Sequence, residues 1–172
     1  MDGSQPIELL KPYSGFQKIS MQEIITDIYR LHGRESRFEP RENSFFLPFR
    51  ALHNSATTDI TKMKTHHYLQ IVVKSEIDPN YLVYFFNSQL GRSLTSSITQ
   101  GTAMKSIRKN DLMNLEIFLP PLETQRAIAR ADQQLSRGKQ FLESTEENFS
   151  KDPNIHTKIN SDLDRIFGIF EI

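Results

Sequence analysis

The sequence predicts an α+β fold in three parts: a mixed domain over residues 1–120, a long helix of coiled-coil type over 121–150, and a short C-terminal helical segment over 151–172. Two observations predict it. Before Pro120-Pro121, short apolar runs alternate with turn residues, which is typical of short strands and helices in one domain. After the proline pair, Gly138 is the one helix-weakening residue up to about Phe149, so a long helix is expected.

The first predicted helix covers residues 21–32. Ser20 stands three residues before Glu23, which is the spacing of a capping box, and isoleucines recur at helical spacing behind it. Gly33 is the expected end of this helix. Two strands are predicted next, over Ser44–Arg50 and Tyr68–Lys74, with a polar loop between them.

A buried helix is predicted to begin at Asp78-Pro79, because aspartate caps helices and proline is tolerated in the first turn. Its body is almost wholly apolar, and Gly91 is expected to interrupt it before a second helical piece. Asn110 or Asp111 is expected to cap one short helical turn. Leu115–Leu119 is predicted to be the last strand, which the proline pair ends.

The long helix carries large apolar residues seven positions apart, which is the spacing of a coiled-coil seam: Ile128, Leu135, Leu142 and Phe149. The spacing favours pairing with another long helix over a surface helix that lies on the domain. An amphipathic segment over 155–170 offers a third alternative, because it could fold back on the seam within the same chain.

Composition limits the function and the compartment. There is no cysteine, so disulfides and thiolate metal sites are excluded. No apolar run is long enough to span a membrane, and no secretory leader is recognisable, so the cytoplasm is expected. The net charge of +0 argues against non-specific coating of nucleic acid. Any DNA-binding face must therefore be local, and no acid occurs between Asp78 and Asp111.

Patterns of catalysis are missing from the sequence. The glycines are dispersed, so there is no Gly-rich phosphate loop. No Asn-Pro-Pro-aromatic tetrapeptide of adenine methyltransferases occurs, and no acid is followed two positions later by lysine, as in many nuclease metal sites. His66 and His67 are adjacent just before the predicted strand Tyr68–Lys74. On a strand they would point to opposite faces and could not easily share a metal. The sequence predicts no enzyme, no cofactor and no metal.

Four segments, in this order, resemble the target recognition domain of type I restriction-modification specificity (S) subunits. They correspond to the aromatic helix of that family, its glycine-led turn into a short strand, its helical turn before a strand, and its proline pair before a long helix. The segments are Tyr81–Ser88, Gly101–Ile107, Asp111–Ile117 and Leu119–Ala129. The resemblance leaves residues 1–77 only loosely matched.

The resemblance implies a sequence reader of double-stranded DNA that directs separate methyltransferase (M) and restriction (R) subunits and lies in residues 1–120. In that family, two recognition domains sit at opposite ends of paired long helices. This sequence has one recognition domain and one long helix, which leaves three alternatives open: a half-subunit that forms a homodimer through the long helix, a fragment of a longer chain, or a divergent single-domain relative.

Basic and amide side chains are the candidate DNA contacts, each with the alternative of a solvated surface charge. Those expected to contact phosphates lie in or near the acid-free stretch: Arg92, Lys105, Arg108 and Lys109. Those expected to contact bases lie in the predicted loops: Arg34, Arg37, Arg41, Arg50 and Asn54, with Lys62 and Lys64 behind them.

Two other functions fit parts of the sequence. One is the DNA-recognition domain of a larger single-chain adenine methyltransferase, separated from its catalytic part. The other is a helical protein-interaction module without DNA binding, which the zero net charge motivates.

Overall fold

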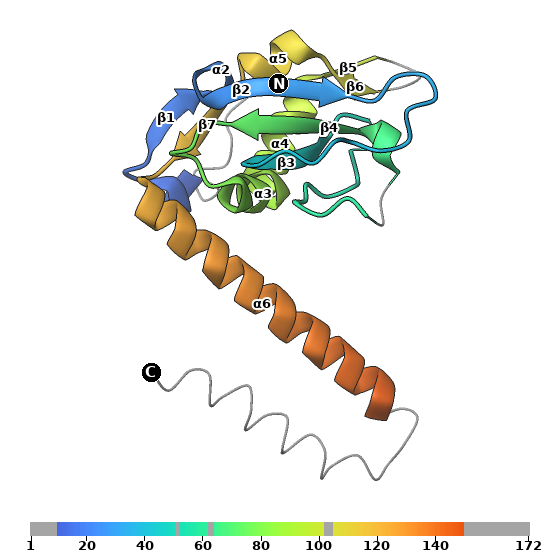
Figure 1. Cartoon of the computed structure of the whole chain (residues 1–172). Coiled ribbons are helices and arrows are strands. Elements are labelled where there is room, and N and C mark those ends of the chain that lie inside the picture. Colours follow the sequence, from blue (N-terminus) through green and yellow to red (C-terminus); the bar gives the residue numbers. More distant parts are fainter. Residues whose placement is uncertain (1–9, 51, 62–63, 102–104, 150–172) are drawn as a thin grey trace. The chain divides into compact units, whose positions relative to one another are not determined.

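The computed structural model describes residues 10–50, 52–61, 64–101 and 105–149. They form an α+β fold with a long helix near the C-terminus, as the sequence predicts (Figure 1). The helices are η1 (Lys11–Tyr13), α2 (Met21–Ile24), η2 (Thr65–His67), α3 (Pro79–Asn87), α4 (Gln89–Ser97), α5 (Lys109–Met113) and α6 (Leu122–Phe149). The strands are β1 (Gln17–Ser20), β2 (Ile25–Arg30), β3 (Ser44–Pro48), β4 (Tyr68–Val73), β5 (Thr99–Gln100), β6 (Ser106–Ile107) and β7 (Glu116–Leu119).

A three-stranded antiparallel sheet in the order β2-β4-β3 is the centre of the domain. Side chains alternate between the faces of a strand, so residues paired across the sheet share a face. Ile71 lies between Ile28 and Phe45, and the Phe45 ring stacks on Phe86 of α3 with centroids 5.9 Å apart. This face is therefore the core face, and α3 lies against it (Figure 1).

The helix pair after β4 begins where the sequence predicts. Asp78 caps α3, because its carboxylate accepts a hydrogen bond of 2.9 Å from the backbone N–H of Asn80. The break before α4 falls at Ser88, whose hydroxyl accepts from Gly91 N–H at 3.1 Å. Gly91 lies inside α4 rather than between the helices, and it is buried. A Cβ built on it would stand 2.0 Å from the carbonyl oxygen of Phe85.

A second layer joins distant parts of the chain, because β1 pairs with β7. Tyr81 of α3 donates a hydrogen bond of 2.5 Å to the carbonyl of Phe118 in β7. Burial raises the pKa of this hydroxyl well above its usual value, and the nearby Tyr13 and Tyr84 raise it further. The hydroxyl therefore stays a neutral donor that ties the helix to the strand.

The prediction of a helix over 21–32 was wrong. The capping box forms, with Ser20 N–H donating to Glu23 Oε1 at 3.2 Å, but the helix ends after one turn at Ile24. From Ile25 the chain is the edge strand β2, which pairs with β4. β-Branched and aromatic residues favour a strand, and the pairing outweighs the local helix signal. Gly33, with φ +58°, lies in the turn after this strand.

Two smaller expectations were also wrong. The short helix α5 has Arg108, not Asn110 or Asp111, at its N-cap. His66 and His67 lie in η2 rather than in a strand. His66 is exposed and His67 is partly buried.

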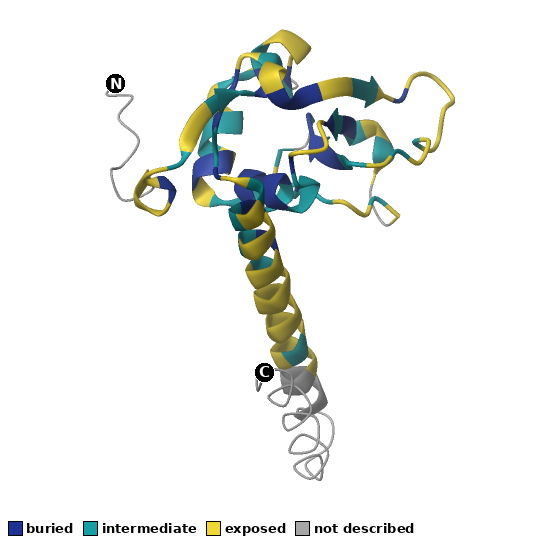
Figure 2. Ribbon diagram, turned by 60° about the vertical axis from the view of Figure 1, so that its left-hand side comes forward, coloured by how far each residue is buried: buried dark blue, intermediate teal, exposed yellow. Residues whose placement is uncertain are grey.

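Helix α6 begins directly after the proline pair, as predicted. In its first turn Gln125 is buried, and its side chain bonds the carbonyl of Pro120 at 2.9 Å and the N–H of Asp78 at 2.8 Å. The chain divides into two compact units, Met1–Ala129 and Arg130–Ile172. From Arg130 the described part of α6 is largely exposed (Figure 2).

The predicted C-terminal helical segment over 155–170 lies outside the described residues, and the division at 120 and 150 stays a prediction. No helix in the described ranges is both long and apolar enough to cross a membrane.

Candidate nucleic-acid interface

A hollow of about 430 Å³ opens where β2 ends and β4 begins. Its apolar side chains come from the core face of the sheet (Ile28 and Leu69), from the residue after β3 (Phe49) and from the short strand β6 (Ile107). Ile107 is fixed there because its N–H donates to the carbonyl of Phe49 at 3.0 Å. In Figure 1, the end of β2, the start of β4 and β6 lie on the same side of the domain.

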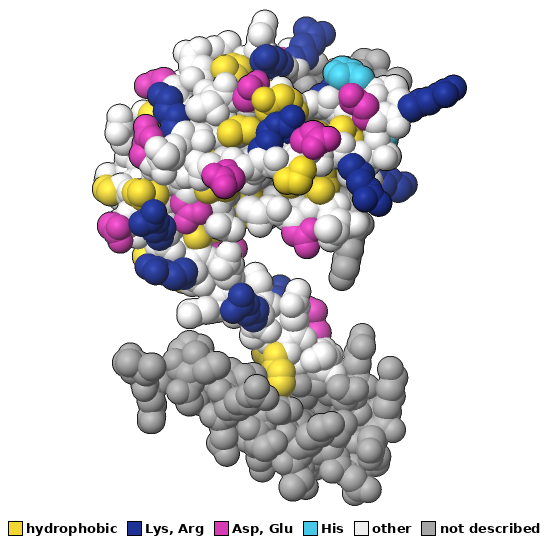
Figure 3. Space-filling model, viewed as in Figure 1, with side chains coloured by type: hydrophobic (Ala, Val, Ile, Leu, Met, Phe, Trp, Pro, Cys, Tyr) yellow, Lys and Arg dark blue, Asp and Glu magenta, His cyan; other side chains and the backbone are white. Residues whose placement is uncertain are grey.

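The polar side chains around this hollow are basic or histidine, apart from Ser106: Arg30, His32, Arg50, Arg108 and Lys109. No carboxylate is among the lining residues. A concave surface with this lining attracts anions. The nearby Glu35 carboxylate accepts a hydrogen bond of 2.7 Å from the backbone N–H of His32 at its edge. Elsewhere basic and acidic side chains are intermixed, as on the face shown in Figure 3.

Two arginines of the hollow lie against one aromatic ring. The guanidinium carbon of Arg30 is 4.7 Å from the centroid of Phe49, and that of Arg50 is 5.2 Å from it. These cation–π contacts restrict both side chains. Nε of Arg50 is buried without a hydrogen-bond partner. A buried donor without a partner is costly.

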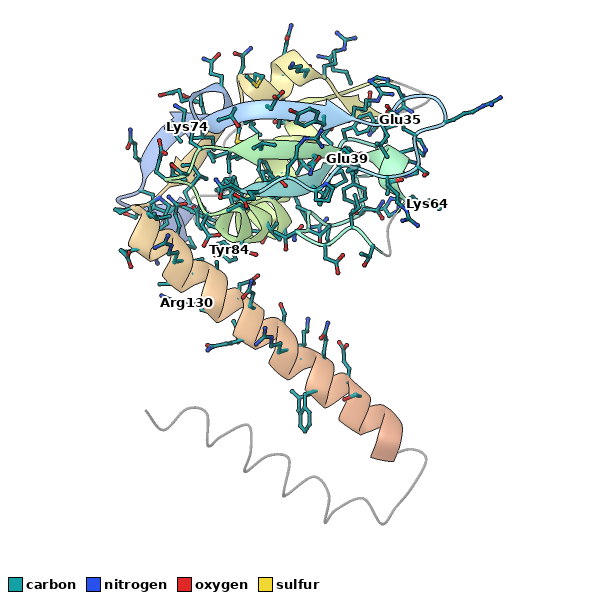
Figure 4. The ribbon with its side chains drawn as sticks, viewed as in Figure 1. Glu35, Glu39, Lys64, Lys74, Tyr84 and Arg130 are labelled. Carbon is teal, nitrogen blue, oxygen red and sulfur yellow. The ribbon has the colours of Figure 1, made fainter. Side chains whose placement is uncertain are left out.

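A second hollow of about 310 Å³ adjoins the first, because Arg30 lines both. It lies on the segment between β2 and β3, which contributes arginines and acids together: Glu35, Arg37, Glu39 and Arg41. Figure 4 shows Glu35 and Glu39 at this end of the sheet, with Lys64 also there.

A family model described as "Type I restriction modification DNA specificity domain" matches residues 57–148, which is more than half of the chain. The chain belongs to this family. The resemblance seen in the sequence is thereby confirmed. The sequence matches no curated protein.

Solved structures of type I systems share the fold of this specificity domain. The S subunit from M. genitalium has a TM-score of 0.57 at 15% identity, over 86% of this chain and 45% of that chain. The HsdS subunit from Thermoanaerobacter tengcongensis has a TM-score of 0.53 at 18% identity, over 84% and 42%. A third structure, described as the basis of complex assembly and conformational transition of the type I R-M system, has a TM-score of 0.54 at 19% identity. The match covers 80% of this chain and 43% of that chain. The chain spans less than half the length of each.

Within the specificity domain, three of the predicted DNA contacts meet at the first hollow. Arg108 and Lys109 reach it from the start of α5, and Arg50 reaches it from the residues after β3. Lys105 is exposed just before β6 and does not line the hollow. The structure thus brings together residues 50 and 108–109, which the sequence keeps apart.

The other predicted contacts are dispersed. Arg37 and Arg41 line the second hollow, and Arg34 is exposed in the same segment. Arg92 bonds the hydroxyl of Ser55 at 3.1 Å and the carbonyl of Asn87 at 3.3 Å, so its guanidinium holds the loop after β3. The remaining three are Asn54, which is partly buried near Arg92, Lys64, which is exposed, and Lys62, which lies outside the described residues.

Sequence reasoning missed Arg30 and His32, which both line the first hollow. Both fell in the predicted helix over 21–32, but Arg30 is the last residue of strand β2 and His32 follows it. Apolar and polar residues do not alternate from Ile24 to Arg30, so no local pattern places Arg30 at the end of a strand, on the same face as Ile28. That face is the one from which the hollow opens.

The apolar seam of α6 is partly described. Ile128 packs against the core of the first unit. Leu135 and Leu142 are 74% and 61% exposed, and nothing is described of the side chain of Phe149. Exposed leucines at this spacing are what the predicted pairing with a partner helix requires.

Among the described residues, no group of three or more His, Asp or Glu side chains could hold a metal ion.

Proposed function

We propose that this chain reads double-stranded DNA as one half of a type I specificity subunit. The observation that carries the proposal is the acid-free hollow with Arg30, His32, Arg50, Arg108 and Lys109 around it, in a chain of the DNA specificity domain family. Duplex DNA is a polyanion, and basic side chains that neutralise phosphates supply much of its binding free energy. The zero net charge limits this attraction to the local surface.

The two hollows suit different tasks. Arg108 and Lys109 begin a short helix at the rim of the first hollow, where they can neutralise phosphates without carrying sequence information. The segment between β2 and β3 offers both donors and acceptors, from Arg37 and Glu39. Arginine pairs with guanine and carboxylates accept from cytosine in the major groove. This segment is therefore the proposed base-reading element.

The subunit is proposed to be non-catalytic and cytoplasmic, and to direct separate M and R subunits. The chain spans 42–45% of the similar structures, so a specificity subunit of full length would need a second recognition domain. A second copy bound through Leu135 and Leu142 would supply it. A purified chain that methylates or cleaves DNA, with turnover that follows the chain through purification, would contradict the non-catalytic part.

The test is selection of bound duplexes from a random pool by the full chain at a stated salt concentration. We expect enrichment of a short motif. The variant Arg50→Gln should lose enrichment of the motif. The control Lys18→Gln should retain it, because Lys18 does not line the hollow and forms an ion pair of 2.8 Å with Glu116. Absence of duplex binding at low salt, with the helix still pairing, would favour the protein-interaction function instead.

A further inference from the structure

Arg41 was a candidate base contact, but its guanidinium is already engaged inside the protein. Its Nη1 donates to Gln70 Oε1 at 2.7 Å and to the carbonyl of Glu39 at 3.1 Å. Its guanidinium carbon lies 3.5 Å from the centroid of the Tyr29 ring. A half-buried arginine with these contacts is poorly placed to reach a base in a groove.

Gln70 is the centre of this arrangement. It is 1% exposed in the middle strand β4, and it pairs with Tyr29 on one side and Phe46 on the other. These three residues therefore share the face of the sheet opposite the core face. The Gln70 amide donates to the carbonyl of Glu39 at 3.1 Å and to Ser44 Oγ at 3.4 Å. The oxygen of this buried side chain is thus bonded to Arg41, and its nitrogen to Glu39 and to Ser44, the first residue of β3.

The same segment has weaker attachments along its length. Phe38 packs on Phe46 with centroids 5.3 Å apart, and Thr65 Oγ1 donates to the carbonyl of Ser36 at 3.2 Å. The segment has no strand or helix of its own between β2 and β3. At its end, Asn43 Nδ2 donates to the carbonyls of Val73 and Lys74 at 2.8 Å and 2.6 Å. Before that end the segment is held by the side-chain contacts above, of which those at Gln70 are the most buried.

We propose that Arg41 is a positioning residue: through Gln70 and Tyr29 it clamps the segment 31–43 on the sheet, so that Arg34 and Arg37 are presented to DNA. The inference rests on the proposed function. It changes the role of Arg41 from reading to holding, and it assigns a part in sequence recognition to Gln70, a residue that DNA cannot reach.

The test combines two readouts on four variants of the full chain. Amide hydrogen exchange without DNA reports the clamp, and motif selection together with the salt dependence of affinity reports recognition. Arg41→Met removes the donor and leaves Gln70 Oε1 without its partner. Gln70→Leu removes the buried amide, and Tyr29→Leu removes the ring and serves if Gln70→Leu fails to fold. Arg37→Met is the matched control in the same segment.

For Arg41→Met and Gln70→Leu we expect the hydrogen-bonded amides of the segment, those of His32 and Glu35, to exchange about tenfold faster or more, as loss of a bond to a buried polar group would give. Exchange in α3 should be unchanged. Both variants should lose sequence preference while the salt slope stays at the parental value. Arg37→Met should alter sequence preference with parental exchange.

The inference is overturned if Arg41→Met flattens the salt slope or changes the motif with parental exchange, because Arg41 would then contact DNA itself. It is also overturned if Gln70→Leu, or Tyr29→Leu in its place, keeps parental recognition. Failure of the parental chain to bind any duplex is a different result. It removes the proposed function, and the exchange data still show whether the clamp exists.

Discussion

Gln125 and Asp78 lie 47 residues apart in the sequence, and the side-chain oxygen of Gln125 accepts a hydrogen bond of 2.8 Å from the backbone N–H of Asp78. Asp78 in turn caps α3, and the amide of Gln125 donates to the carbonyl of Pro120. One buried side chain therefore connects the start of the long helix, the start of the aromatic helix and the end of the last strand.

Replacing Gln125 with leucine should destabilise the domain. The backbone N–H of Asp78 and the carbonyl of Pro120 would each lose a partner in a buried setting, which costs about 1–3 kcal/mol for each group. Urea unfolding followed by circular dichroism measures the free energy. Gln134→Leu, an exposed position of the same helix, is the control and should stay near the parental value. Equal midpoints for the two variants would contradict the role of Gln125.

Two glycine-to-alanine changes should act in opposite directions. Gly91→Ala places a Cβ against the Phe85 carbonyl at 2.0 Å, and overpacking against fixed backbone should cost about 3 kcal/mol. Gly138→Ala meets nothing within 4 Å in α6 and should stabilise that helix by about 1 kcal/mol. Thermal unfolding by far-UV circular dichroism distinguishes them. A tolerated Gly91→Ala would mean that α3 and α4 can separate.

Replacing Arg108 and Lys109 with alanine should weaken binding to all duplexes alike. Each lost phosphate contact flattens the dependence of log affinity on log salt by about 0.9, so the slope should fall by up to about 1.8. Adding Lys105→Ala should bring the loss to about 2.7 only if that exposed lysine also contacts a phosphate. Titrations at several salt concentrations measure the slopes, with Lys18→Ala as control. An unchanged slope would place the phosphate contacts elsewhere.

Leu135→Asp should reduce self-association or loosen packing within the second unit. A leucine that becomes buried contributes about 1.5–3 kcal/mol, and an unpaired aspartate at the same place cannot be buried cheaply. Light scattering gives the mass in solution, and thermal unfolding gives the stability. Gln134→Asp carries the same charge at the neighbouring exposed position and should leave both unchanged. If Leu135→Asp behaves like this control, the seam faces solvent in the functional protein.

The order of elements from Ser44 onward was predictable from sequence because the signals there are local. Asp78-Pro79 caps a helix through its own side chain, and the proline pair ends a strand through its own geometry. The helix prediction over 21–32 was wrong because the capping box at its start forms but is followed by only one helical turn. Pairing of β2 with β4, which lies more than 40 residues later, decides the rest, and no pattern within 21–32 reports that pairing.

The candidate site was predicted in part for a similar reason. Arg108 and Lys109 stand out as cations in an acid-free stretch, but the hollow also needs β2, the residues after β3 and β4. Arg30 enters it at the end of β2 and His32 just after that strand, both in a segment that the sequence assigned to a helix. Arg41 looked like a base contact because its partner Gln70 is 29 residues away and its burial is invisible in the sequence.

The position of Gln125 also affects where the recognition unit can be joined to the long helix of another protein in a chimaera. A recombination point at Pro120-Pro121 looks natural on the sequence, but it would remove the residue that bonds Pro120 and Asp78. If the helix joined there has no glutamine at the position of Gln125, the carbonyl of Pro120 and the N–H of Asp78 lose their hydrogen-bond partner. A chimaera joined after Ala129 would carry the first two turns of α6 along with the recognition unit, and the foreign spacer would then begin where the helix is already exposed.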